Sequence, residues 1–566
     1  MSEKTALDVR GLVSIVKRNR IPEWLFIVIA SIGLGLAWFL ILYGKYTLYF
    51  THVYWIYSTG RDPLQHQLGW EFFRNESWRF PLGLIRDYGY PYGTTVTFMD
   101  SIPLFAFIFK LLSPWLSENF QYFGLWELTS VICQMAVGLL IMREFTKSNL
   151  VKVLGASMLV LSPAMIYRAY YHSSLSAHWI LLLAILFVIL EYRNRMKNWY
   201  WLALFSVAML VHLYYIPMLI PLWGVGLLFR YQRDHKKRIF LFEPLKIVVI
   251  ILGIGFCTGI FGLSFSELSQ IGFGDYSWNL NGFFNPFDTS KFFKGLPYQT
   301  PQDEGFSYLG AGNFILLPIA FVFFIIKDAA KRNWKFFLPF AVISVGFMLL
   351  ALSERAMVND QIIWDFTLFE PLRKLVSLFR STGRFIWPVY YLILIFGVAA
   401  LVRNFRYAWP ILILAIIIQF VDIQPLLETK RVPGLAEYGA GGMKSDFWQE
   451  AGKTNTTIKI IPTEYYEHLA VYAVRHHMTI SSGYFGRADI PSMESLSQKT
   501  WQELLAGKSD NKTLYILSDP IMVKKAYQDL TQWMYVCKID KYDVVFSQDN
   551  PVTQSGFDFN SVCLIP

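Results

Sequence analysis

The stretch WLFIVIASIGLGLAWFLILY at residues 24–43 decides the class of this protein. It carries no charge along its whole length, and it is as long as the roughly 20 residues with which an α-helix crosses the hydrocarbon core of a bilayer. A signal peptide has a shorter apolar core of about 7–15 residues, followed by a small-residue cleavage site. Neither feature is present here, so the sequence predicts a permanent first anchor.

The rest of the chain has the same character. Of its 566 residues, 54% are hydrophobic and only 16% are charged, against about 25% charged residues in soluble domains. Long apolar runs recur, and we expect a polytopic, all-α membrane bundle of about eleven spans. The predicted spans begin at Trp24, Phe123, Val153, Leu175, Trp199, Tyr215, Ile247, Ala311, Phe336, Phe385 and Tyr407.

The lysines and arginines predict the orientation of the bundle. Cytoplasmic loops keep basic residues, because the translocation machinery resists exporting them. Basic clusters occupy every second loop, which places the N-terminus in the cytoplasm and the C-terminus outside, and which explains the net charge of +10 without a nucleic acid partner. The clusters are Lys17, Arg18 and Arg20; Arg143, Lys147 and Lys152; Arg193, Arg195 and Lys197; Arg230, Arg233, Lys236, Lys237 and Arg238; Lys327, Lys331, Arg332 and Lys335; and Arg403 with Arg406.

Residues 102–115 are apolar, but they are few, contain Lys110 and are flanked by prolines. If this segment crossed the membrane, every later basic loop would change sides, so we interpret it as an interfacial or half-inserted helix. Residues 44–121 then form one long outer loop. Residues 264–310 and 353–384 form two more outer loops of a membrane domain, 1–427.

From residue 428 to 566 the pattern is that of a soluble domain. Short runs of β-branched and aromatic residues predict strands, and predicted helices at 464–476 and 493–505 lie between them, which favours a small open α/β sheet on the periplasmic side. We also expect a linker at 437–442, and a disulfide between Cys537 and Cys563, because the outer compartment is oxidising. The predicted strands are 458–462, 478–482, 514–519, 534–539 and 542–547.

Four motifs carry a resemblance to known proteins. The chain resembles an uncharacterised family of bacterial multi-spanning membrane proteins, which is in turn similar to the GT-C glycosyltransferases. The resemblance implies an enzyme that takes a sugar from a polyprenyl-phosphate carrier at the outer face and has an acidic residue early in its first outer loop; Asp62 occupies that position. The motifs are GRDPLQHQLGWEFFR at 60–74, TFMDSIP at 97–103, EGFSYLGAG at 304–312 and FRSTGRFIWPVYY at 379–391.

The chemistry of such a transfer explains an acid at this position. An acceptor hydroxyl is a weak nucleophile, so an inverting transfer needs a carboxylate on the face opposite the leaving group to take its proton. Asp62 is therefore the candidate catalytic base. The alternative for Asp62 is a helix N-cap before Pro63, and Asp100, just ahead of Ile102, has the same alternative.

Arg380 and Arg384 frame the FRSTGR segment directly before a predicted span. A guanidinium there can hold a lipid phosphate in a two-point contact at headgroup depth; the alternative is that it only extends toward the lipid headgroups. Arg168, His172 and His178 lie in YRAYYHSSLSAHW on the outer side. They are candidates for further donors to the phosphate, or for interfacial hydrogen-bonding groups.

Glu304 lies in the second large outer loop, where it either faces substrate or is a solvated turn carboxylate. With Asp62 or Asp100 it is a candidate ligand of a divalent cation. No DxD motif in the first outer loop supports metal dependence, and no CxxC or Cys/His cluster predicts zinc. His212 lies on an otherwise apolar helix and is interpreted as a satisfied histidine of the bundle, although such groups can line a cavity.

Two functions from different classes follow. The first is a GT-C-type glycosyltransferase of the bacterial inner membrane that passes the sugar to a glycan, lipid or protein. The second is a transporter or flippase of a lipid-linked sugar, which would place ionisable residues near the midplane and show related halves. The acids and arginines concentrate instead in the outer loops, and no halves repeat, which favours the enzyme.

Overall fold

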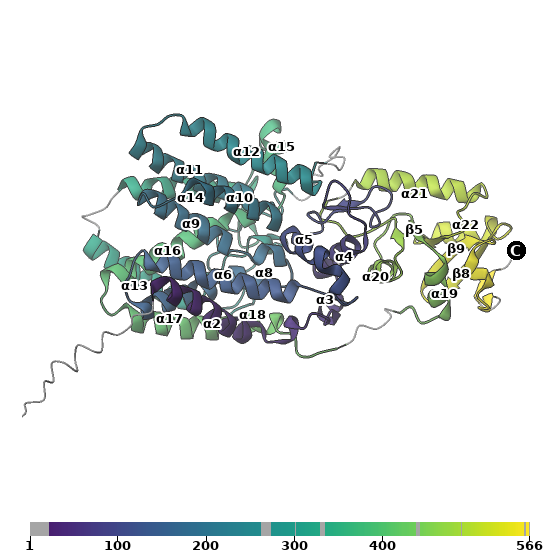
Figure 1. The fold of residues 1–566 in the computed structure, drawn as a ribbon, viewed down its shortest axis with the longest axis horizontal. Helices are drawn as coiled ribbons and strands as arrows, with labels where there is room; N and C mark the ends of the chain where they lie inside the picture. Colours follow the sequence, from purple (N-terminus) through teal and green to yellow (C-terminus); the bar gives the residue numbers. More distant parts are fainter. Residues whose placement is uncertain are drawn as a thin grey trace, which may run out of the picture.

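The computed structural model describes residues 22–261, 273–299, 301–328, 334–436, 442–487, 489–559 and 562–564. A bundle of long helices forms one end of the molecule and a small sheet domain forms the other, with α3 (Tyr54–Thr59), α4 (Arg61–Asn75) and α5 (Pro103–Leu112) between them (Figure 1). Most of the expected linker, 437–441, lies outside the described residues. So do five residues of the basic clusters: Lys17, Arg18, Arg20, Lys331 and Arg332.

Each of the predicted apolar runs lies in a helix. In the described part of the chain, six helices are long and apolar enough to cross a membrane, and α17 (Ala408–Asp422) with α18 (Gln424–Lys430) is a seventh candidate, bent by 56°. The six are α2 (Glu23–Tyr43), α6 (Phe123–Arg143), η3 with α9 (Ser173–Tyr192), α12 (Ile239–Thr258), α14 (Trp334–Leu352) and η7 with α16 (Thr382–Asn404).

The remaining predicted runs give helices that are shorter or end in charged residues. They are α7 (Asn149–Val160), α10 (Asn198–Val211), α13 (Ala311–Asp328) and α11 (Tyr215–Asp234). The count of eleven spans therefore stays a prediction. Large apolar side chains such as Phe242, Val249 and Val345 are exposed along α12 and α14, which is the surface that lipid covers in a membrane protein.

The segment interpreted as interfacial forms α5 followed by the turn η2 (Ser113–Trp115). A helix of ten residues is about 15 Å long, half the thickness of the hydrocarbon core. The ammonium of Lys110 lies 3.9 Å from the ring centroid of Phe73 in α4 and 4.7 Å from that of Trp78. The segment therefore packs on the first outer loop.

Impermeant maleimide labelling tests the predicted topology. In a background with Cys133 and Cys257 changed to serine, we expect Ser117→Cys and Asp510→Cys to react in intact cells, since both positions are exposed and predicted to lie outside. Lys147→Cys should react only after permeabilisation. A protected Ser117 probe would contradict the interfacial interpretation of α5, because the segment would then span.

The C-terminal domain contains a six-stranded mixed sheet in the order β10-β8-β9-β7-β5-β6. The chain pairs β5 with β6 and β7 in parallel, and β9 pairs with both β7 and β8 in antiparallel fashion. The predicted disulfide is confirmed: Cys537 in β8 and Cys563 in β10 are bonded. The strands are β5 (Thr457–Ile461), β6 (Thr479–Ile480), β7 (Thr513–Leu517), β8 (Met534–Ile539), β9 (Tyr542–Ser547) and β10 (Cys563–Leu564).

Alternation along the strands explains why helices cover both faces of this sheet. In β7, Leu514 and Ile516 join the main core, while Tyr515 and Leu517 pack on the other side against Trp501. The predicted helices are present with shifted ends. The helices of this domain are α19 (Asp446–Thr454), α20 (Glu467–Arg475), α21 (Ile490–Leu505), α22 (Pro520–Asp529) and the turn η8 (Pro551–Gln554).

Short elements fill the loops. They are η1 (Tyr46–Leu48), β1 (Leu84–Ile85), β2 (Thr94–Thr95), α8 (Pro163–Arg168), η3 (Ser173–Ser176), η4 (Gln302–Gly305), β3 (Arg355–Val358), β4 (Gln361–Asp365), α15 (Glu370–Val376), η6 (Ser377–Phe379) and η7 (Thr382–Ile386). Several of them position the charged residues described next.

Candidate functional site

Four segments that are distant in the sequence meet at the end of the bundle that faces the C-terminal domain, where α4 and α8 lie in Figure 1. The start of α4, the end of α8 with the turn after it, η4 and η7 each contribute charged side chains. We call this set the ionic cluster. It consists of Asp62, Arg168, His172, Glu304 and Arg384.

A helix break places two members of the ionic cluster. Pro163 is favoured at the first position of a helix, and the Ser162 hydroxyl caps α8 by accepting from the backbone N–H of Met165. One predicted apolar run therefore becomes two helices, α7 and α8. Because α8 ends at Arg168 and the chain turns directly after it, Arg168 and His172 face the same site.

Two glycines bring Glu304 to Arg384. Gly305 in η4 and Gly383 in η7 lie so close together that a Cβ on Gly383 would be 2.9 Å from Cα of Gly305. Any side chain at either position would separate the two turns. Because Glu304 precedes Gly305 and Arg384 follows Gly383, this close approach places the carboxylate of Glu304 beside the guanidinium of Arg384, although the two residues are 80 positions apart in the sequence.

Glu304 is the centre of the ionic cluster. Its Oε2 lies 3.0 Å from Nη1 of Arg168 and 2.7 Å from Nη2 of Arg384, whose Nε also donates to it at 2.9 Å. Its Oε1 lies 3.6 Å from Nε2 of His172. Burial opposes ionisation, but the two guanidiniums outweigh it and hold the pKa of Glu304 well below its usual range. Arg168 and Arg384 carry two positive charges, which Glu304 and, through His172, Asp62 balance.

Asp62 joins the ionic cluster through His172, whose Nε2 lies 3.6 Å from Oδ2 of Asp62. The Asp62 side chain is 30% exposed, so it stays accessible from solvent. The capping alternatives are wrong for both acids. The N-cap of α4 is Gly60 and that of α5 is Ile102, and no side chain accepts a capping hydrogen bond from the start of either helix.

A second acid–histidine pair lies beside the ionic cluster. Oδ1 of Asp100 is 3.3 Å from Nε2 of His212, so His212 faces this site. Burial raises the pKa of Asp100, but His212 and then His66 more than offset it, and the pKa falls to about 2. His66 was not predicted as a site residue, although its ring centroid lies 6.4 Å from that of His172. It follows Asp62 by four residues, and residues at that spacing share a helix face, so the sequence could have indicated that it lies near Asp62.

The C-terminal domain reaches the site through a loop after β6. Burial, and then the charge and hydrogen bond of Asp62, raise the pKa of Tyr484 to about 12. The backbone N–H of Tyr484 donates to the Tyr88 hydroxyl at 3.0 Å, and that of Gly486 to the carbonyl of Phe98 at 3.0 Å. The loop is therefore attached to the first outer loop. Tyr484 was not predicted as a site residue, because no local sequence pattern indicates its contact with Asp62, more than 400 residues earlier in the chain.

Besides Asp100, two predicted site residues lie outside the ionic cluster. Arg380 is exposed, with its guanidinium 5.3 Å from the ring centroid of Tyr276, and within the described ranges no carboxylate is at ion-pair distance from it. Nδ1 of His178 is 2.8 Å from the hydroxyl of Tyr391, and its ring centroid lies 4.6 Å from that of Trp387, with the planes tilted by 42°. His178 thus belongs to a buried hydrogen-bond chain of the bundle.

Some of the strained backbone of the described chain lies at the site. Arg61, Asp100 and Tyr170 have φ values of 44°, 53° and 68°. For residues other than glycine, this left-handed conformation costs about 1–3 kcal/mol and is found most often at functional sites. Arg61 directly precedes Asp62, and Asp100 is itself one of the acids. Tyr170 lies in the turn between Arg168 and His172.

The residues do not fit a divalent cation. Among the residues that the structure describes, no group of three or more His, Cys, Asp or Glu is arranged to hold a metal ion. Glu304, a candidate ligand, is already engaged by Arg168 and Arg384, and a cation at its carboxylate would lie against two positive charges.

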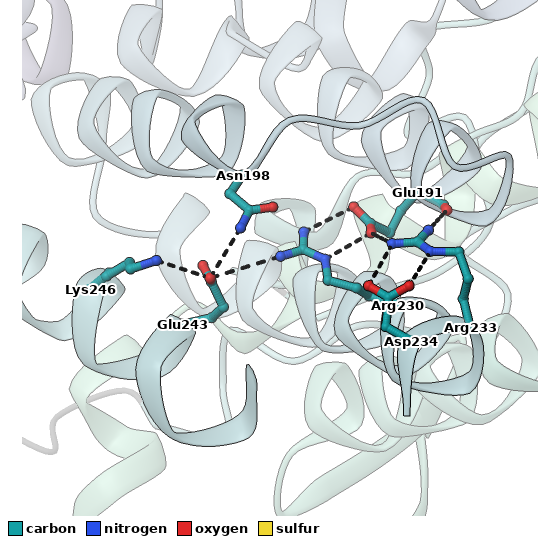
Figure 2. Close-up of polar contacts among 7 residues, drawn as sticks. All are labelled: Glu191, Asn198, Arg230, Arg233, Asp234, Glu243 and Lys246. Atoms are coloured by element: carbon teal, nitrogen blue, oxygen red, sulfur yellow. Dashed lines mark hydrogen bonds and ion pairs between the residues drawn. The ribbon is translucent and has the colours of Figure 1, made fainter. Parts of the chain in front are cut away.

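A separate buried network surrounds Glu191 (Figure 2). Both carboxylate oxygens of Glu191 accept from Arg230, at 2.8 and 3.0 Å, and Arg233 contributes a further contact at 3.4 Å. Glu243 in α12 accepts from Asn198 in α10 and from Lys246 in its own helix. Glu191 and Glu243 are both paired, and they lie near loops that the sequence predicts to be cytoplasmic. We therefore interpret this network as a structural contact between helices and not as a reactive site.

The fold and the ionic cluster define a polytopic membrane protein with a charged site between its helical bundle and a small sheet domain. The chain belongs to the family described as domain of unknown function DUF6311, whose model matches residues 32–424. The model of the DUF6311 C-terminal domain matches residues 447–547.

Two solved structures of an oligosaccharyltransferase from Archaeoglobus fulgidus share a weak likeness with this chain. AglB in complex with an inhibitory peptide and a dolichol-phosphate is 10% identical, with 93% of this chain and 74% of that chain covered and a TM-score of 0.40. The enzyme tethered to an acceptor peptide with the NVT sequon is 11% identical, with 92% and 74% covered and a TM-score of 0.41. No curated protein matches the chain.

Proposed function

We propose that this protein is a membrane glycosyltransferase that moves a sugar from a polyprenyl-phosphate-linked donor to a glycan, lipid or protein at the outer face of the bacterial inner membrane. The observation that supports it is the ionic cluster. An accessible carboxylate, Asp62, touches a histidine beside two arginines that share one acid, Glu304. This arrangement combines a proton acceptor with two guanidiniums, and transfer from a phosphate needs both kinds of group.

In the proposed reaction, Asp62 accepts the proton of the acceptor hydroxyl as its oxygen forms a bond to the anomeric carbon. The bond from that carbon to the phosphate oxygen breaks on the opposite face, and the electron pair leaves with the polyprenyl phosphate. The configuration is therefore inverted. His172 orients the carboxylate, and the guanidiniums of the site stabilise the departing phosphate.

The proposal includes a topology and a division of the chain. The membrane domain would end near residue 427 and the domain from 428 onward would lie in the periplasm. The disulfide between Cys537 and Cys563 supports this side of the membrane, because disulfides are rare in the reducing cytoplasm.

The direct test incubates the purified full chain with short polyprenyl-phosphate sugars carrying a radiolabel in the sugar, together with cell-envelope fractions as acceptor. We expect label in a new product and release of polyprenyl phosphate. A transporter would instead move the intact lipid-linked sugar between the leaflets of proteoliposomes without cleaving it, and that result would contradict the proposal.

We propose different roles for the two predicted phosphate-binding arginines. Arg384 is tied to Glu304, so we assign direct phosphate contact to Arg380, whose guanidinium is exposed. We expect Arg380→Ala to raise the KM for the donor by about tenfold, the loss of one charge-assisted hydrogen bond, and Arg380→Lys to lose less. The matched control is Arg406→Ala, which removes an exposed arginine near Tyr407 at the predicted cytoplasmic end. Equal KM values in Arg380→Ala and wild type would rule out this contact.

A further inference from the structure

A pocket of about 540 Å³ lies between the segment that follows α18 and α3, next to the first turn of α4. Pro63 and Tyr171 line it, and each is the chain neighbour of a residue in the ionic cluster, but no member of that cluster lines it. We call it the Lys430 pocket. Its lining carries two cations, Lys430 and Arg431, and no carboxylate. The hydroxyl groups of the lining belong to Tyr54, Ser58, Thr59, Tyr170, Tyr171 and Thr429.

Lys430 is a buried cation without a paired acid. It is only 4% exposed, and its Nζ donates to the carbonyl of Tyr167 at 2.7 Å and lies 4.5 Å from the ring centroid of Tyr171. In the described part of the chain no carboxylate oxygen is within ion-pair distance of it, and Glu127 attracts it only from farther away. Since a buried charge is costly without a partner, a bound anion would stabilise this ammonium group.

Arg431 supplies the second positive charge of the pocket, and its contacts show that the pocket lies beside the end of α2. Its Nη2 and Nε donate to the carbonyls of Ile41 and Leu42, at 2.5 and 3.3 Å, at the end of α2. Leu40 and Ile41 of α2 are exposed apolar residues of a predicted span, and Leu435 at the pocket is 56% exposed. The pocket therefore lies beside the end of the predicted first span, where we expect the lipid surface to meet water.

We propose that the Lys430 pocket binds the phosphate group of a membrane lipid. Two cations, several hydroxyls and no acid suit a phosphate, and a lipid can bring its phosphate to this depth while its chains stay in the bilayer. The inference goes beyond the proposed function and does not depend on it, because lipid binding is measured without sugar transfer.

The test uses the purified full chain in detergent and native mass spectrometry with three probes: dioleoyl phosphatidic acid, dioleoylglycerol and inorganic phosphate. Wild type should bind phosphatidic acid, and Lys430→Met should weaken that binding by about tenfold or more, because a charge-assisted contact is lost. Lys430→Arg should retain most of it. The matched control is Lys45→Met, which removes an exposed lysine just after α2 that does not line the pocket.

A variant that fills the pocket keeps the test decisive if Lys430→Met fails to fold. Ala436 is an exposed lining residue, so Ala436→Trp should block the pocket while leaving Lys430 in place. Binding in Ala436→Trp equal to wild type, or an equal loss in Lys45→Met and Lys430→Met, would overturn the proposal. Equal binding of dioleoylglycerol would also overturn it. Competition by inorganic phosphate at the affinity of phosphatidic acid would assign the site to free phosphate instead of a lipid.

Discussion

Asp62→Asn should lower the turnover of sugar transfer by about a hundredfold or more, the usual contribution of a general base. The amide keeps the shape of the side chain but cannot take a proton from the acceptor. Because Asp62 is partly exposed and caps no helix, the exchange should leave folding and donor binding nearly unchanged. Turnover and KM for the donor are measured separately on purified protein, alongside thermal melting.

The control for Asp62 is Glu118→Gln, which removes a negative charge from an exposed position of the same outer loop. We expect wild-type turnover from Glu118→Gln. If Asp62→Asn kept full turnover, another group would have to accept the proton. An unchanged turnover with a raised KM would give Asp62 a binding role instead.

Glu304→Ala should destabilise the fold by about 3–5 kcal/mol, because it leaves two buried guanidiniums without their carboxylate. Removing one of these positive charges as well should restore part of the loss, so the double variant Glu304→Ala with Arg384→Ala should be more stable than Glu304→Ala alone. Thermal melting in detergent measures both effects. A melting temperature of Glu304→Ala equal to that of wild type would contradict the geometry of the ionic cluster.

Glu191→Ala is the matched comparison for Glu304→Ala. Glu191 is also a buried carboxylate shared by two arginines, Arg230 and Arg233, but it belongs to the network away from the site (Figure 2). We expect similar destabilisation from both substitutions. Transfer per folded molecule should fall only for Glu304→Ala, because that substitution alone changes the charges around the proposed phosphate. An equal loss of specific transfer in both variants would reduce Glu304 to a purely structural role.

The sequence alone determined the elements that depend on local patterns. An unbroken apolar run gives a helix wherever it lies, so every predicted run is helical. The predicted strands match the bounds of β8 and β9, and they lie within a residue or two of β5, β6 and β7. The disulfide between Cys537 and Cys563 was also predictable from their shared domain. The count of spans was not, because breaks such as Ser162–Pro163 and the bend before α18 shorten helices without making the sequence less apolar.

Only the tertiary structure decided which charged residues act together. Within its own segment, each charged residue also has an ordinary structural role. Asp62 could be a helix cap, Arg168 and His172 could be interfacial hydrogen-bonding groups, and Glu304 could be a solvated turn carboxylate. Their joint site depends on two glycines, Gly305 and Gly383, that let η4 touch η7, and on strained turns that aim the side chains. These contacts join segments that are up to hundreds of residues apart in the sequence. The free energy that stabilises them comes from packing and from charge pairs between segments, which cannot be read from any one segment alone.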